Sequence, residues 1–228
     1  ILQADGQWDK YLPQTEQQTN PSFDSYGCTV FGTENIVEIL LKALYGQDNN
    51  FSERYVYNLV GIVPPGADPH DVAETIRRDG LIDQDLLPMT ENFEDFSSPR
   101  PMESKYLIMG NQFPFELKHE YVFKDKDPHE TKIAKMKEAL AYSPLGISVT
   151  AWEEEGGVYV DKGEPNTHWT VCYGWNDKGW KVFDSYDPFY KIVSFDHHIE
   201  RCKRYLLVKK PQQVWWLDLL NRLRSLIY

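Results

Sequence analysis

Residues 166–188 read NTHWTVCYGWNDKGWKVFDSYDP and predict a β-hairpin. Apolar and polar residues alternate on both sides of the turn-forming segment WNDKGW, residues 175–180, which is typical of two strands joined by a turn. His168 opens the first strand and Asp184 follows the second. Because antiparallel strands place such ends side by side, the hairpin predicts a contact between a histidine and an aspartate.

Strand patterns surround this hairpin in the second half of the chain, whereas helical patterns fill the first half. Apolar residues recur at helical spacing after Cys28, and two further helices are predicted within residues 51–61 and 70–80. Residues 88–105, which are acidic and contain several prolines, are predicted to be a long connector. The remaining strands, separated by one helix in residues 127–143, are predicted in residues 105–110, 120–124, 145–152, 190–195 and 205–210.

This order predicts an α+β protein of two lobes in residues 1–210. A helical lobe should span about residues 14–105, and an antiparallel sheet or barrel lobe about residues 106–210. A cleft between two such lobes is a usual place for an active site. Residues 211–228, PQQVWWLDLLNRLRSLIY, predict a C-terminal amphipathic helix that packs on this domain or docks on another domain, subunit or particle component.

Composition excludes several classes of function. The net charge of −11 argues against nucleic acid as a partner, because phosphate binding needs clustered Lys and Arg. No apolar run is long enough to span a membrane, and no signal peptide is visible. Three cysteines do not form a disulfide framework, so we favour an intracellular or virion-associated protein over a secreted one. The segment DHHIERC, residues 196–202, matches no zinc spacing and is interpreted as a solvated turn.

Cys28 is the candidate nucleophile. It lies in DSYGCTVFGTEN, where a loop gives way to a helix, and a helix N-terminus lowers the pKa of a thiol. Cys172 alternates inside a strand and is interpreted as core, and Cys202 lies in a charged stretch. A cysteine nucleophile needs a base and an orienting group, roles that His168 and Asp184 fit. Taken singly, each of these three residues also fits a structural role in the core, a strand end or a turn.

The order of these residues resembles the papain-like cysteine peptidases, of the divergent kind found in bacteria and phages. In that family a glutamine precedes the cysteine that opens the central helix, as in TEQQ (residues 15–18) and Cys28. His168 with TVCYGW resembles the family's histidine strand, and WKVFDSY (residues 180–186) resembles its Asn-Ser-Trp segment with Asp for Asn and Tyr for Trp. Residues 63–88 and 143–152 resemble a Gly-rich substrate loop and a Pro-x-x-x-x-Val strand, so the resemblance covers about residues 8–208.

The resemblance implies further site residues. Gln18 would be the side-chain donor of the oxyanion hole, with Gln17 as the alternative because NPSFD (residues 20–24) lengthens the interval to Cys28. Gly66, Trp169 and Tyr186 are the candidate substrate contacts, and Tyr186 takes the place of the family's shielding Trp. The usual Cys-Gly-Ser-Cys-Trp box and the disulfide cysteines are absent.

The expected function is hydrolysis of peptide bonds by a Cys28–His168–Asp184 triad through a thioester acyl-enzyme, with polypeptide substrates and neither a metal nor an organic cofactor. Two alternatives stay open at this point. One is a cysteine amidase acting on peptidoglycan, and the other is a catalytically silent papain-like scaffold or binding domain.

Overall fold

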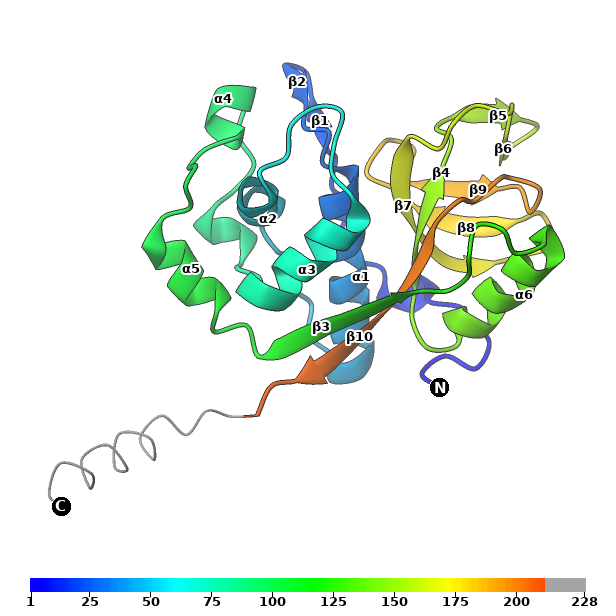
Figure 1. The fold of residues 1–228 in the computed structure, drawn as a ribbon, viewed down its shortest axis with the longest axis horizontal. Helices are drawn as coiled ribbons and strands as arrows, with labels where there is room; N and C mark the ends of the chain where they lie inside the picture. The colour runs from blue at the N-terminus through cyan, green and yellow to red at the C-terminus, as the bar shows by residue number, and fades with distance from the viewer. Residues whose placement is uncertain (212–228) are drawn as a thin grey trace, which may run out of the picture.

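The computed structural model describes residues 1–211, with helices gathered on one side and a large sheet on the other (Figure 1). The predicted C-terminal helix lies outside the described residues. Helix α1 (Cys28–Tyr45) is central, and its residues from Thr29 to Leu41 are all buried. The other helices of this side are α2 (Glu53–Val60), α3 (Pro69–Asp79), α4 (Phe93–Phe96) and α5 (Ser104–Gly110), with a short 3₁₀ turn at Gln84–Leu86. A second 3₁₀ turn, Asp9–Tyr11, lies by the sheet, where the Trp8 N–H donates to the Tyr173 carbonyl.

Capping residues set the bounds of α2 and α3. The Ser52 side chain accepts a hydrogen bond from the backbone N–H of Tyr55, and the Asp68 side chain accepts one from the N–H of His70. Gly61 ends α2 in the left-handed conformation, with φ of 74°. These caps place the loop between α2 and α3 beside the N-terminus of α1.

The sheet has eight strands in the order β3-β10-β4-β7-β8-β9-β6-β5, and every pairing is antiparallel except that of β6 with β9. Helix α6 (His129–Leu140) packs on its outer side (Figure 1). The α+β prediction is therefore confirmed. The strands are β3 (Phe115–Tyr121), β4 (Leu145–Val149), β5 (Glu153–Glu155), β6 (Val158–Val160), β7 (His168–Trp175), β8 (Trp180–Phe183), β9 (Tyr190–Val193) and β10 (Cys202–Lys209).

Strands β7 and β8 form the predicted hairpin. They pair antiparallel from Trp175 opposite Trp180 to Val171 opposite Phe183, with an irregularity between Cys172 and Gly174. Strand β7 is buried over almost its whole length, because β4 and β8 flank it and α1 packs across it. The hairpin thus places the start of β7 and the end of β8 side by side, at the same end of these two internal strands.

The segment KYLIMG, residues 105–110, was predicted as a strand, and that prediction is wrong. It lies in α5, which ends at Gly110 against the Tyr55 hydroxyl and the Asp79 carbonyl, where a Cβ atom would overlap both. A short apolar run does not by itself distinguish a strand from a helix, so packing against α2 and α3 decides. The acidic connector also contains α4, which begins at the Asn92 cap.

The N-terminal arm holds a short hairpin at NPSFD, the segment that lengthens the interval between Gln18 and Cys28. Strands β1 (Thr19–Asn20) and β2 (Phe23–Asp24) pair antiparallel just before Cys28. Earlier in the arm, Trp8 is fully buried, and its indole N–H donates to the Leu140 carbonyl. Among the described residues, no helix is long and apolar enough to cross a membrane.

Candidate active site

Cys28 begins α1, at the boundary between the helices and the sheet. The first N–H groups of a helix have no partner within it, so this thiol lies beside free donors and the positive end of the helix dipole. Cys28 is half-buried, whereas Cys172 and Cys202 are fully buried. Burial raises the pKa of Cys172 to about 12 and that of Cys202 well above its usual value. Of the three thiols, Cys28 is therefore the accessible one.

His168 and Asp184 are in direct contact, with 2.6 Å between Nε2 and Oδ1. Both residues are buried, at 6% and 1% exposure. Burial disfavours the imidazolium, but the Asp184 carboxylate and the neighbouring Cys28 outweigh it and raise the pKa of His168 to about 9. Asp184 therefore holds one ring nitrogen, and the ring lines the same cleft as Cys28.

Asp184 has a second partner that the sequence analysis missed. The Lys191 ammonium on β9 lies 2.7 Å from Asp184 Oδ2 and is as deeply buried as the carboxylate. Burial opposes ionisation of Asp184, but His168 and Lys191 together hold its pKa below the usual range. The carboxylate is thus bracketed by two cationic groups.

Two aromatic side chains flank the His168 ring. The Tyr186 ring centroid is 5.2 Å away. The Trp152 ring lies at 5.5 Å with the two ring planes at 74°. Trp152 follows β4 and was not identified from sequence, although it closes the segment SPLGISVTAW. These rings limit the access of water to the contact between His168 and Asp184.

Gln18 is buried and fully hydrogen-bonded. Its Nε2 donates to Asp24 Oδ1 at 3.0 Å and to the Tyr186 hydroxyl at 2.7 Å, and its Oε1 accepts from the Ser185 hydroxyl at 2.7 Å. Gln17 is exposed, and within residues 1–211 its side chain bonds only its near neighbour Thr19. The structure therefore brings Gln18, rather than Gln17, into the network around Tyr186.

A cleft of about 450 Å³ lies beside Cys28 and His168 and is lined by residues from both the helical side and the sheet side of the molecule. Gly66 lines it with φ of +137°, and a Cβ atom there would come within 3.2 Å of a carbonyl oxygen. The Gly66 N–H donates to the Val63 carbonyl at 2.9 Å. An ion pair between Arg201 and Asp68, 2.6 Å long, links the sheet to the N-terminus of α3 at this cleft.

Trp169 also lines the cleft, yet only 3% of it is exposed. Its ring packs between Gly32 of α1 and Gly146 of β4, where added Cβ atoms would contact or overlap the indole. With so little of Trp169 exposed, contact of this residue with a substrate stays a prediction. Its main contacts fix β7 against α1.

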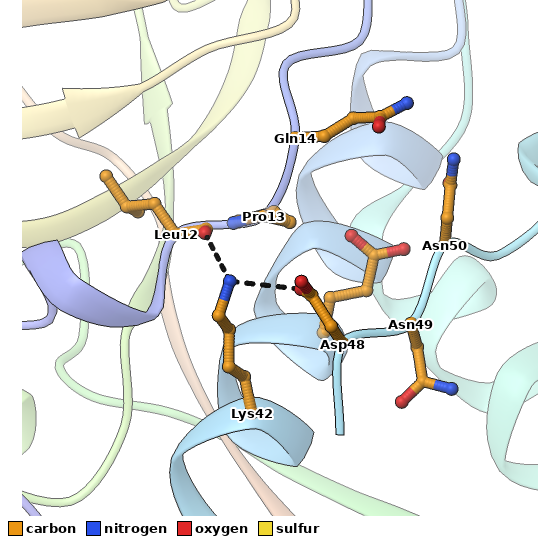
Figure 2. Close-up of a pocket in the computed structure, with 8 residues that line it drawn as sticks. Leu12, Pro13, Gln14, Lys42, Asp48, Asn49 and Asn50 are labelled. Carbon is orange, nitrogen blue, oxygen red and sulfur yellow. Dashed lines mark hydrogen bonds and ion pairs between the residues drawn. The ribbon is translucent and has the colours of Figure 1, made fainter. Parts of the chain in front are cut away.

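A second, polar cavity of about 420 Å³ lies away from Cys28 (Figure 2). Within it the Lys42 ammonium contacts the Leu12 carbonyl and the Asp48 carboxylate, so an internal cation already serves these oxygens. No cluster of His, Cys, Asp and Glu suited to a metal ion occurs within residues 1–211. In the segment DHHIERC, His197 is buried, and its Nε2 accepts a hydrogen bond from the Thr150 N–H.

Comparisons with known proteins bear on the fold. Neither a family model nor a curated protein sequence matches the chain. Solved structures do match: the Clostridial cysteine protease Cwp84 after propeptide cleavage gives a TM-score of 0.65 at 12% identity, covering 89% of this chain and 57% of its own.

Two further structures agree with this match. Digestive procathepsin L 3 of Tenebrio molitor gives a TM-score of 0.63 at 14% identity, covering 87% of this chain and 68% of its own. Bromelain from Ananas comosus gives a TM-score of 0.63 at 14% identity, covering 89% of this chain and 98% of its own. At these identities the likeness concerns the architecture alone, and on that ground the chain has the fold of the papain-like cysteine proteases.

Proposed function

We propose that this chain is a cysteine peptidase that hydrolyses peptide bonds through Cys28, His168 and Asp184. The observation that carries the proposal is the arrangement of His168, which a buried carboxylate holds at 2.6 Å and which lines the same cleft as the accessible Cys28 thiol. A nucleophile, a base and an orienting group in one hydrogen-bonded series are what thiol catalysis requires. The papain-like fold supports the same assignment.

The chemistry follows from these positions. The Cys28 thiolate attacks the peptide carbonyl carbon, and a carbon–sulfur bond forms as the carbonyl oxygen becomes an oxyanion. Collapse of this intermediate breaks the carbon–nitrogen bond, and the His168 imidazolium gives its proton to the leaving amine. Water then adds to the thioester while His168 takes a proton from it, the carbon–sulfur bond breaks, and the acid product leaves as the Cys28 thiolate and the His168 imidazolium are restored.

Two donors are available for the oxyanion. The backbone N–H of Cys28 lies at the free N-terminus of α1. Gln18 is the second, but both of its N–H groups already donate to Asp24 and Tyr186. Gln18 must therefore exchange one of these partners for the oxyanion. Without substrate, both N–H groups of its side-chain amide are hydrogen-bonded within the protein.

The cleft suits an extended polypeptide. The Gly66 N–H donates to the Val63 carbonyl within an isolated β-bridge, so an extended substrate strand would replace this bond in order to pair with Gly66. The required φ and the nearby carbonyl oxygen explain why glycine stands at this position.

The test is to treat the folded protein with a thiol-reactive peptide probe and, in parallel, with a library of unstructured peptides and with peptidoglycan fragments. We expect the probe to label Cys28 and the peptides to be cleaved, and we expect Cys28→Ala to abolish both without changing the melting temperature. Cys202→Ala is the control, because its thiol is fully buried. Cleavage confined to peptidoglycan would indicate the amidase, and labelling without any turnover would indicate a silent scaffold.

A further inference from the structure

Lys191 has a deeply buried ammonium with no free hydrogen-bond donor. It donates to Asp184 Oδ2 at 2.7 Å, to the Tyr186 carbonyl at 2.7 Å and to the Pro188 carbonyl at 2.5 Å. Its Nζ also lies 4.9 Å from the centroid of the Trp152 ring. An ammonium has three protons, and each of them has an acceptor here. Lys191 therefore has a defined position, with none of its protons available for transfer.

The charge of Lys191 matters because of what lies on the other side of Asp184. The Asp184 carboxylate bonds His168 through Oδ1 and Lys191 through Oδ2. A buried carboxylate with no second partner would attract the imidazolium proton strongly, because opposite charges interact more strongly away from water. Such a histidine would be a poor acid toward a leaving amine. Pairing with Lys191 makes the carboxylate part of a neutral pair.

We propose that Lys191 is a positioning residue of the catalytic unit, which neutralises Asp184 so that the carboxylate orients His168 without retaining its proton. This inference rests on the proposed function. By bonding the Tyr186 and Pro188 carbonyls, the same ammonium also holds the turn that follows β8.

Several charged and titratable groups face His168 and Asp184. His168 faces the Cys28 thiol, the Asp184 carboxylate and the Tyr186 ring. Asp184 faces His168 and Lys191, and its charge also reaches the Tyr159 hydroxyl on β6. Lys191 is therefore the cation that offsets Asp184 from the side opposite His168.

The experiment is a double-mutant cycle of Lys191→Met with Asp184→Asn. We expect Lys191→Met alone to lower kcat/KM by roughly 10–100-fold, a coupling in the usual range for groups in one buried network. In the Asp184→Asn background no carboxylate remains to be neutralised, so the same substitution should cost less than about threefold or restore activity. Lys132→Met is the matched control, since Lys132 is also buried, bonds Asp125 and the Ile199 carbonyl, and does not line the cleft.

A second readout follows the proton on His168 without any substrate. The rate at which iodoacetamide alkylates Cys28 is measured against pH, and its upper step reports loss of the imidazolium proton. This step should move to higher pH in Lys191→Met and to lower pH in Asp184→Asn. Because the readout needs no peptide hydrolysis, it tests the inference even if the substrate proves not to be a polypeptide.

A purely structural Lys191 predicts different results. Lys191→Met would then lose activity by the same factor in both backgrounds, and the alkylation profile would not move; either result overturns the proposal. If Lys191→Met does not fold, Lys191→Gln takes its place, because it keeps an N–H donor for the two carbonyls but carries no charge. Full activity in that variant, with an unshifted profile, would also refute the proposal.

Discussion

Replacing Glu34 by Gln should stabilise the protein at neutral pH. Glu34 lies on α1, is 1% exposed, and neither of its carboxylate oxygens has a hydrogen-bond partner within residues 1–211. Burial, with the charges of Glu38 and Glu16 added, raises the pKa of Glu34 well above its usual value. Burial likewise raises the pKa values of Glu38 and Glu53. The helical side of the molecule thus holds buried carboxyl groups that favour the protonated form.

The size of the effect follows from proton linkage. A carboxyl group with a raised pKa in the folded state contributes stability below its unfolded pKa, about 4.3, and this contribution is lost as the pH rises through the folded pKa. Each such proton changes the unfolding free energy by at most about 1.4 kcal/mol per pH unit, hence about 4 kcal/mol per unit for three. Glu34→Gln removes one of these titrating protons and should reduce the slope of unfolding free energy against pH by about 1.4 kcal/mol per pH unit.

The assay is urea unfolding at intervals between about pH 5 and pH 8. Glu91→Gln is the control, because Glu91 is exposed. An unchanged slope in Glu34→Gln, or an equal change in the control, would refute the reasoning. The result also matters for activity measurements, because it separates alkaline unfolding from alkaline loss of the His168 proton.

Three further predictions concern the cleft. Gly66→Ala should raise KM more than it lowers kcat, because the φ of +137° at position 66 strains any residue other than glycine. Equal KM values for the variant and the parent protein in steady-state assays would contradict this prediction. Tyr186→Phe should lower stability by about 1–3 kcal/mol in thermal unfolding, since it removes the hydroxyl that Gln18 bonds. A loss of 10²–10³ in its kcat would instead make that hydroxyl an oxyanion donor. Finally, kcat/KM should fall as the pH rises through about 9, where His168 loses its proton, and Asp184→Asn should move that limb to lower pH.

The sequence predicted the hairpin and its ends because local patterns determine them. Alternation on both sides of WNDKGW gave β7 and β8, and the antiparallel pairing placed His168 near Asp184. Capping chemistry at Ser52 and Gly61 gave α2. The missed hairpin of β5 and β6 had a usable signal, since Gly156 and Gly157 form a two-residue turn between its strands.

Other features could not be predicted, because long-range partners determine them. Alternation in YKIV does not indicate that Lys191 faces inward, since a lysine is rarely buried without a partner. Lys191 is buried because Asp184 lies opposite its ammonium. Gln18 was identified, but its commitment to Asp24 and Tyr186 depends on the β1–β2 hairpin, which the sequence indicated only as an insertion.

The position of His168 relative to Cys28 depends on how closely the sheet approaches α1. These two residues belong to opposite sides of the molecule, so no local pattern holds them together. Trp169, the neighbour of His168 on β7, is packed between Gly32 of α1 and Gly146 of β4, both of which lack a Cβ atom. A side chain at either glycine would push the indole, and β7 with it, away from its place. The two glycines and the indole therefore act as the spacer that sets the distance between thiol and imidazole, a role that accounts for the burial of Trp169 better than contact with a substrate.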